Sequence, residues 1–230
     1  MGTRPVTGRN CLYVQRRFSC TVLTATSGSN ATFFRAGKLK DVHDRERLAP
    51  HWRDLSEPRR NGDDWPSRKP TALTKATRFV IVGTAGAARE DVKSGDVIVV
   101  NSAVRDDGVS GHYLPPDAYV DADPSLADER AAALQRRGLQ PIVAPTWTVP
   151  TPYRSTAAEV ELMAREGVAV VECEVASLLA VAEALGVSAG ACLYVPGSLT
   201  NPAEEPGRDQ RTPAVMFNAT LEALGLPSQT

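Results

Sequence analysis

The chain has 230 residues, of which 42% are hydrophobic and 23% charged, a balance typical of globular proteins. A net charge of −1 gives no overall attraction to nucleic acid or to an acidic membrane, and no apolar stretch reaches membrane-spanning length. The four cysteines form no CxxC pair and lack a nearby histidine, so we expect no metal site, and reduced thiols in a cytoplasmic protein.

Residues 1–75 differ in composition from the rest of the chain. Met1 to Lys40 contains no Asp or Glu, and Arg, Ser and Thr are frequent there. This composition fits an organellar targeting peptide, a disordered tail or coding sequence read in an altered frame, and all three interpretations stay open. Residues 43–70 are dense in charge and proline, which predicts a linker or irregular surface. We therefore expect an irregular basic segment over 1–75 and a folded domain over 76–230.

From residue 78 onward, short apolar runs alternate with helical patterns. Thr156 and Glu159 have the spacing of a capping box, while Asp123 can cap a helix that Pro124 opens. The predicted strands are 78–83, 95–104, 140–147 (limited by Pro145), 168–173 and 189–195, and the predicted helices are 123–138, 156–167, 174–186 and 212–225. This alternation predicts an α/β domain whose helices cover a largely buried sheet.

Two glutamates stand in the apolar stretch "VAVVECEVASLLAVAEALG", at positions 172 and 174. Residues two apart in a strand share a face, so Glu172 and Glu174 project together if the strand stays extended through both. They then lie where a strand feeds a helix, at the edge that usually binds ligands in open α/β sheets. Two interpretations remain open: carboxylates that accept hydrogen bonds from adjacent sugar hydroxyls, or helix-start carboxylates stabilised by the helix dipole.

The stretch "VGTAGA", residues 82–87, follows the first predicted strand of the domain. Gly83 and Gly86 can leave backbone amides available for a phosphate or another anion. The spacing is not that of a dinucleotide-binding fingerprint, because the following residues lead into another strand. Taken alone, the stretch predicts either an anion-binding loop or a tight turn.

Taken together, the motifs resemble the nucleoside phosphorylase superfamily, which holds uridine phosphorylase, hexameric purine nucleoside phosphorylase and nucleosidases. The resemblance covers roughly residues 78–200, in the family's order and spacing. Four stretches carry it: "VGTAGA" (82–87), "SGDVIVVNSAVRDDGVSGHYLPP" (94–116), "TWTVPTPYRST" (146–156) and "VECEVASLLAVAEALGV" (171–187). The last is similar to the family's Glu-Met-Glu-Ala signature, with Cys173 replacing Met and Val175 replacing Ala. The resemblance implies a three-layer α/β/α sandwich around a mixed, mostly buried sheet, assembled as a homo-oligomer of dimers within hexamers.

The resemblance also implies roles for individual residues. Glu174 matches the signature glutamate that grips the ribose hydroxyls, and we expect it to be the catalytic residue. Glu172 is expected near the base or in a supporting position, Cys173 under the ribose, and Tyr153 in the aromatic wall of the base pocket. Gly83 and Thr84 match the family's phosphate-contacting loop. The implied partners are a nucleoside and phosphate, with no cofactor, because inorganic phosphate is the co-substrate.

The chain departs from the family's pattern at its phosphate site. Ile81 stands where the family commonly has an arginine that binds phosphate, and Arg78 lies three residues earlier, so a strand turns it to the other face. Gly197 stands where purine-specific members have an aspartate, and residues 1–75 contain no recognisable counterpart of the family's first strand and phosphate loop. Three hypotheses follow: a nucleoside phosphorylase that yields free base and ribose 1-phosphate, a hydrolytic nucleosidase, or an inactive nucleoside-binding remnant.

Overall fold

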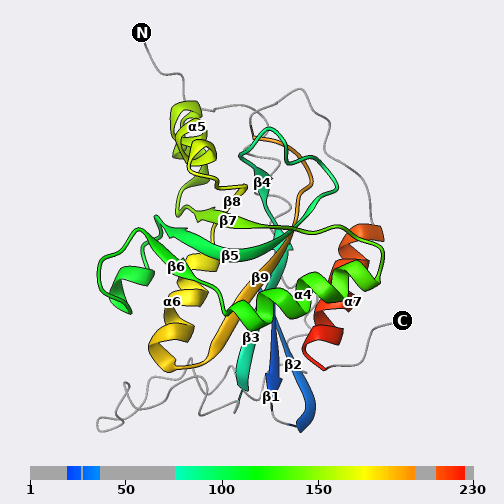
Figure 1. The fold of residues 1–230 in the computed structure, drawn as a ribbon. Coiled ribbons are helices and arrows are strands. Elements are labelled where there is room, and N and C mark those ends of the chain that lie inside the picture. The colour runs from blue at the N-terminus through cyan, green and yellow to red at the C-terminus, as the bar shows by residue number, and fades with distance from the viewer. Residues whose placement is uncertain (1–19, 27, 37–75, 200–210, 226–230) are drawn as a thin grey trace, which may run out of the picture.

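A computed structural model describes residues 20–26, 28–36, 76–199 and 211–225 (Figure 1). Within these ranges the chain builds a nine-stranded mixed sheet in the order β2-β1-β3-β9-β5-β7-β8-β4, with β6 paired to β5. The strands are β1 (Cys20–Thr26), β2 (Gly28–Ala36), β3 (Ala76–Thr84), β4 (Gly86–Ala87), β5 (Val97–Arg105), β6 (Tyr119–Asp121), β7 (Ile142–Thr148), β8 (Val170–Glu172) and β9 (Ser188–Tyr194). No helix in the described ranges is long and apolar enough to cross a membrane.

The helices cover the sheet on both faces, which confirms the predicted three-layer α/β/α sandwich. They are α4 (Pro124–Arg136), α5 (Ala157–Arg165), α6 (Val175–Leu185) and α7 (Arg211–Ala223), with short 3₁₀ turns η2 (Ser110–His112) and η3 (Pro152–Arg154). Figure 1 shows α4 and α7 side by side, and Arg136 and Arg137 of α4 both pair with Glu222 of α7. Helix α6 covers the opposite face, so the sheet is buried between apolar layers.

Successive side chains on the central strands pack alternately into the two apolar layers on either face of the sheet. On β3, Val80 and Val82 pack with α4 and α7, whereas Ile81 packs with α6. Strand β5 behaves in the same way, because Val97 and Val99 join the first cluster and Ile98 the second. The period of two in a strand therefore explains why both predicted strands read as continuous apolar runs.

Residues 20–36 correct the expectation of an irregular amino-terminal segment. Strands β1 and β2 form an antiparallel hairpin, and β1 also pairs with β3, from Thr21 opposite Val82 to Thr26 opposite Ala76. The β-branched residues of "CTVLTAT" and the turn-forming "SGSN" after it are ordinary hairpin signals, which the basic composition obscured. The other residues of the predicted 1–75 segment lie outside the described ranges.

The predicted helices and strands from residue 78 onward are present with their ends shifted by a few residues; β3 is longer than predicted, β8 is shorter, and the short strands β4 and β6 were not predicted. Strand β7 continues through Pro145 to Thr148, because the pairing register with β5 shifts between Val100 and Ala103, opposite the proline. Such an irregularity accommodates a residue that lacks a backbone donor. Both predicted caps form: Asp123 accepts a hydrogen bond from the Leu126 amide, and Thr156 and Glu159 make the reciprocal capping box of α5.

One buried side chain of the α4 layer lacks a hydrogen-bonding partner. Arg130 is 1% exposed, and no acceptor among the described residues bonds its guanidinium nitrogens. The group lies against Gly190 of β9, where a Cβ atom would collide with it. Burial lowers the pKa of Arg130 to about 10. This arginine is a local cost to stability, since buried charges ordinarily require partners.

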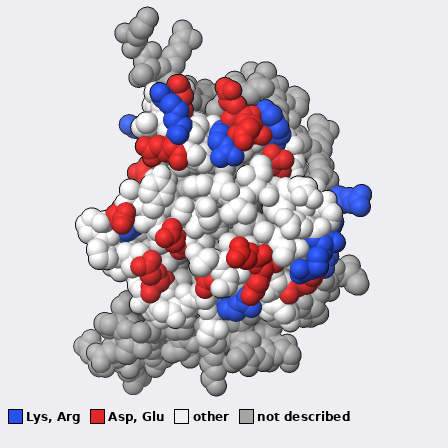
Figure 2. All heavy atoms as spheres, viewed as in Figure 1, with Lys and Arg blue, Asp and Glu red and all other residues white. Residues whose placement is uncertain are grey.

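The face of the molecule seen in Figure 2 carries both signs of charge at its upper and lower ends and an uncharged band between them. Strands β5 and β7 cross the middle of this view in Figure 1, and Val143 of β7 is 51% exposed. Because acidic and basic groups occur together, this face presents no single-sign patch of the kind that binds nucleic acid.

Candidate active site

Three neighbouring strands place their last residues at one edge of the sheet. Strands β5, β7 and β8 run parallel to one another, so their carboxyl ends meet. Thr148 ends β7 and pairs with Glu172, which ends β8. The amide of Val149 continues this contact by donating to the Glu172 carbonyl, 2.9 Å away. This edge therefore holds the signature glutamates, as the ligand crevice of an open α/β sheet would require.

The two glutamates do not project together, because β8 stops at Glu172. Glu172 is 1% exposed, and its carboxylate turns back over the start of α6. Its Oε2 accepts from the amides of Glu174 (2.6 Å) and Val175 (2.8 Å). The condition for the two side chains to share a face is thus not met, since a bend after Glu172 lets its carboxylate bond the amides at the helix start instead. Glu172 acts as a capping group for α6, the second of the two interpretations of these glutamates.

Glu174 has a different environment. It is the N-cap residue of α6 but makes no side-chain capping bond, and it is partly exposed. Because Glu172 already bonds the amides of Glu174 and Val175, the Glu174 carboxylate is not needed as a cap. The structure therefore separates a buried, fully bonded carboxylate from a neighbouring one that is partly exposed to solvent.

Burial raises the pKa of both carboxyls. The pKa of Glu172 rises to about 7, although hydrogen bonds from Thr148 and from the Glu174 and Val175 amides oppose the rise, and repulsion from Glu174 adds to it. Burial also raises the pKa of Glu174, against a hydrogen bond from the Cys173 backbone. Two coupled carboxyls with raised pKa values at a sheet edge are a usual mark of a functional site.

Two threonines of β7 complete the surroundings of Glu172, and sequence reasoning missed both. Thr146 and Thr148 are fully buried, and both hydroxyls lie within hydrogen-bond distance of Glu172 Oε1. Thr148 Oγ1 also accepts from the Ala176 amide at 2.9 Å. Thr146 and Thr148 are two residues apart on β7, so they share a face of the strand. This spacing is the sequence signal that could have indicated that both point toward the same neighbour.

The loop after β5 joins the same edge and also escaped the sequence reasoning. Asp107 accepts from Ser177 in the first turn of α6 and from both the amide and the hydroxyl of Ser110. Burial acts to raise the pKa of Asp107, but these hydrogen bonds outweigh it and lower the pKa. Asp107 thus fastens the loop to α6 beside the two glutamates.

Cys173 and Tyr153 belong to different parts of the chain around this edge, the bend after β8 and the turn η3. Cys173 is partly buried against the cluster that contains Trp147 and Val171. Tyr153 belongs to η3. An open pocket adjoins that turn, lined by Asp106, Trp147, Val149, Pro150, Thr151, Arg154, Ser155 and Glu159. The indole of Trp147 donates to Asp106 at 3.2 Å and is almost fully buried, so its main role is packing.

The stretch "VGTAGA" forms strand rather than an open loop. Gly83 is buried and pairs with Leu193 of β9, and Thr84 is the last residue of β3. The amide of Ala85 donates to the Tyr194 carbonyl, and that of Ala87 to the Gly197 carbonyl, both at 3.0 Å. These two amides are therefore satisfied within the protein. Phosphate contact by Gly83 and Thr84 stays a prediction.

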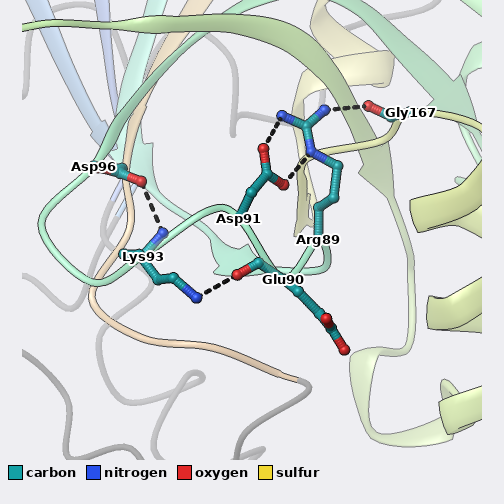
Figure 3. A network of polar contacts seen from close by, with 6 residues as sticks. All are labelled: Arg89, Glu90, Asp91, Lys93, Asp96 and Gly167. Atoms are coloured by element: carbon teal, nitrogen blue, oxygen red, sulfur yellow. Dashed lines mark hydrogen bonds and ion pairs between the residues drawn. The ribbon is translucent and has the colours of Figure 1, made fainter.

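The two arginines nearest this stretch are both engaged. Arg78 forms an ion pair with Glu129 of α4, on the face opposite Ile81, as the strand period predicted. Figure 3 shows Arg89 held in a fork by Asp91, with Nη1 donating to the Gly167 carbonyl at 3.1 Å. Ile81 itself is buried. Neither arginine of the described domain near the motif presents an unpaired cation to a phosphate.

Comparison with known proteins identifies the family. The family model described as the phosphorylase superfamily matches residues 68–223. The chain belongs to the phosphorylase superfamily. This membership confirms the resemblance drawn from the four sequence stretches.

Curated relatives of this phosphorylase-superfamily chain include enzymes for both pyrimidine and purine nucleosides. Uridine phosphorylase of Haemophilus influenzae is 32% identical over 75 residues, covering 33% of this chain and 30% of that protein. Purine nucleoside phosphorylase DeoD-type of Bacillus cereus is 30% identical over 63% of this chain and 60% of its own length. The Aliivibrio fischeri protein of the same name is 27% identical, over 67% and 66%. The matches thus span about a third to two thirds of these relatives.

A solved structure agrees with the fold of this superfamily member. The P knowlesi homologue of P falciparum PNP superposes with a TM-score of 0.59 and 23% identity, covering 66% of this chain and 62% of that one. At this identity the similarity supports the α/β sandwich alone.

Within the described residues, no group of His, Cys, Asp and Glu side chains could hold a metal ion.

Proposed function

We propose that the chain cleaves the N-glycosidic bond of a ribonucleoside with inorganic phosphate, giving free base and ribose 1-phosphate. The observation that carries the proposal is that Glu172 and Glu174 have different hydrogen-bond partners and different exposure. Glu172 caps α6, which leaves the partly exposed Glu174 carboxylate available to the ribose hydroxyls. The names of the uridine and purine nucleoside phosphorylase relatives support the reaction class.

In the proposed reaction a phosphate oxygen bonds to C1′ while the bond from C1′ to the base nitrogen breaks. The bonding electrons leave with the base, which takes up a proton. Positive charge develops on the ribosyl ring, and the Glu174 carboxylate, hydrogen-bonded to the ribose hydroxyls, favours that charge more than the neutral nucleoside. Cys173 is proposed to pack under the ribose, with Tyr153 beside the base and Gly83 and Thr84 near the phosphate. No cofactor enters this scheme.

A hydrolytic nucleosidase is the second candidate, and the surroundings of Ile81 favour it. The isoleucine is buried where the family has a phosphate-binding arginine, and Arg78 and Arg89 are paired elsewhere. Losing a two-pronged arginine contact weakens phosphate binding, whereas attack by water does not require it. The two candidate functions therefore differ in the nucleophile, which is phosphate in one and water in the other.

The deciding experiment incubates the purified full chain with uridine, inosine and methylthioadenosine, each with and without phosphate, and measures free base. We expect release that depends on phosphate and is accompanied by ribose 1-phosphate. Release without phosphate would establish the nucleosidase instead. Absence of release from all three substrates would favour the inactive nucleoside-binding remnant, which calorimetric titration with each nucleoside would then test.

The cellular setting and assembly belong to the same proposal. We expect the chain to act in the cytoplasm as a homo-oligomer, as the resemblance to the superfamily implies, with a nucleoside and phosphate as its small-molecule partners. Sedimentation analysis of the full chain measures the assembly directly. A monomer at micromolar concentration would contradict this part of the proposal and leave the reaction chemistry intact.

A further inference from the structure

Three consecutive amides open helix α6, and side chains from two strands hold all three. The Glu174 and Val175 amides donate to Glu172 Oε2, and the Ala176 amide donates to Thr148 Oγ1. Glu172 comes from β8, and Thr148 from the neighbouring β7. These two side chains therefore bond the three amides that open the helix to the sheet.

The direction of these hydrogen bonds follows from the number of protons. A backbone amide can only donate, so Thr148 Oγ1 accepts from Ala176, and with Glu172 ionised the single hydroxyl proton is left to point at Glu172 Oε1. Oε2 accepts two amides, and the Thr146 hydroxyl, 3.4 Å from Oε1, has a nearer acceptor for its single proton in the Val170 carbonyl at 3.2 Å. Thr148 is thus the one side chain that bonds both the glutamate and the helix.

Neither Glu172 nor Thr148 can contact a ligand directly. Glu172 is 1% exposed and Thr148 is fully buried, so both can affect a bound substrate only through neighbouring residues. The neighbour that they control is Glu174, whose own amide is bonded by Glu172 and whose position is that of the N-cap residue. A shift of the first helical turn would move the Glu174 carboxylate with it.

We infer that Thr148 is a positioning residue, whose hydroxyl locks Glu172 and the first turn of α6 so that the Glu174 carboxylate meets the ribose of the substrate. The inference rests on the proposed function for its catalytic consequence. The hydroxyl itself is required, because a methyl group in its place would leave the buried Ala176 amide without an acceptor and Glu172 Oε1 without its main donor.

The test compares two substitutions at one position. Thr148→Val keeps the shape of the side chain and removes the hydroxyl, whereas Thr148→Ser keeps the hydroxyl. We expect Thr148→Val to lower kcat/KM for nucleoside cleavage about 10- to 100-fold, because small displacements of a reacting group have effects of that size. Thr148→Ser should restore activity to within about threefold of the wild-type chain. Equal losses in both variants would overturn the inference.

A double variant separates positioning from general loss of structure. If Thr148 acts through Glu174, Thr148→Val should cause no further loss of kcat in a chain that already carries Glu174→Ala. Losses that multiply would show that Thr148 acts independently of Glu174 and would overturn the inference. Circular dichroism and thermal unfolding of each variant establish that folded proteins are being compared.

Amide hydrogen exchange tests the hydrogen bond between Thr148 and the Ala176 amide independently of catalysis. In Thr148→Val the amide of Ala176 should exchange faster than in the wild-type chain, while in Thr148→Ser it should stay protected. Unchanged protection in Thr148→Val would overturn the inference, whatever the enzyme does. An inactive wild-type chain with the expected exchange pattern would instead overturn the proposed function and leave the structural role of Thr148 in place.

Discussion

At the scale of single residues, the site depends on two glutamates that the fold treats differently. Glu172 accepts from Thr148 and from two helix amides, with Thr146 shared between Glu172 and the Val170 carbonyl, whereas Glu174 has no capping role. Chemically identical side chains two positions apart thus acquire distinct surroundings from burial and backbone geometry. Their separate substitution should give separate consequences.

Glu174→Ala should remove the proposed contact with the ribose hydroxyls and lower kcat/KM about 100- to 1,000-fold, the usual cost of losing one preorganised electrostatic contact. The matched control is Glu161→Ala on α5, where the glutamate is exposed and forms only an (i, i+4) pair with Arg165. This control should keep wild-type activity, since surface pairs contribute little. Steady-state kinetics with the preferred nucleoside measures both, and an active Glu174→Ala variant would refute the site.

Glu172 should make the stability of the fold depend on pH. The folded chain binds a proton at Glu172 more tightly than the unfolded chain does, because burial raises the pKa from 4.5 to about 7. The free energy of unfolding should therefore fall as pH rises through this window, and the raised pKa of Glu174 acts in the same direction. Glu172→Gln cannot ionise, so its decline should be smaller.

Urea unfolding at about pH 5 and about pH 8 measures this effect, and the decline should be about 2–3 kcal/mol smaller in Glu172→Gln than in the wild-type chain. The amide can still be accommodated, since its oxygen can accept the Glu174 and Val175 amides and its nitrogen can donate to the two threonines. Equal declines in both proteins would show that Glu172 does not titrate in this range.

At the scale of elements, local signals predicted the helices and strands well. Asp123 and the pair Thr156 and Glu159 fixed the helix starts because capping needs only neighbouring residues. The same reasoning could not place Thr148 beside Glu172, because 24 residues separate them and only the β7–β8 register brings them together. It also left open whether the strand stays extended through Glu174, since the turn that lets Glu172 cap α6 leaves no mark in the alternation of apolar residues.

Helix α4 contains the one element-scale feature that conflicts with stability. Arg130 is buried without a hydrogen-bond acceptor among the described residues and packs against Gly190. Arg130→Met should raise the free energy of unfolding by about 1–3 kcal/mol, because it removes a desolvated charge and keeps most of the packing volume. Arg130→Ala is the control that removes the charge but leaves a cavity, so it should be less stable than Arg130→Met.

Chemical denaturation of the three proteins at one pH decides between these effects. A destabilised Arg130→Met variant would mean that the guanidinium has a favourable role that outweighs its desolvation. The favourable role would then be attraction to nearby carboxylates, since Glu129 and Asp123 both act to keep Arg130 charged. Added salt would then diminish the difference between the variants.

At the scale of the whole molecule, the sheet extends beyond the domain boundary that the sequence suggested. Strand β1 borders β3, whose other neighbour is β9, so β3 is a central strand only while β1 is present. The family model begins at residue 68 and does not include the hairpin. Composition alone placed residues 20–36 outside the fold because it ignores the long-range pairing that seats the threonine-rich β1 between β2 and β3.

Removal of residues 1–36 should therefore destabilise the chain more than removal of residues 1–19 does. The longer deletion takes away β1 and leaves the backbone groups of β3 from Ala76 to Val82 without partners on one side. We expect a loss of about 3 kcal/mol in the free energy of unfolding, from a few net hydrogen bonds. An unpaired edge of this length also pairs readily with other chains, so the longer deletion should aggregate. Urea unfolding and light scattering measure the two effects, and equal stability and solubility of both deletions would show that β1 contributes nothing to the sheet.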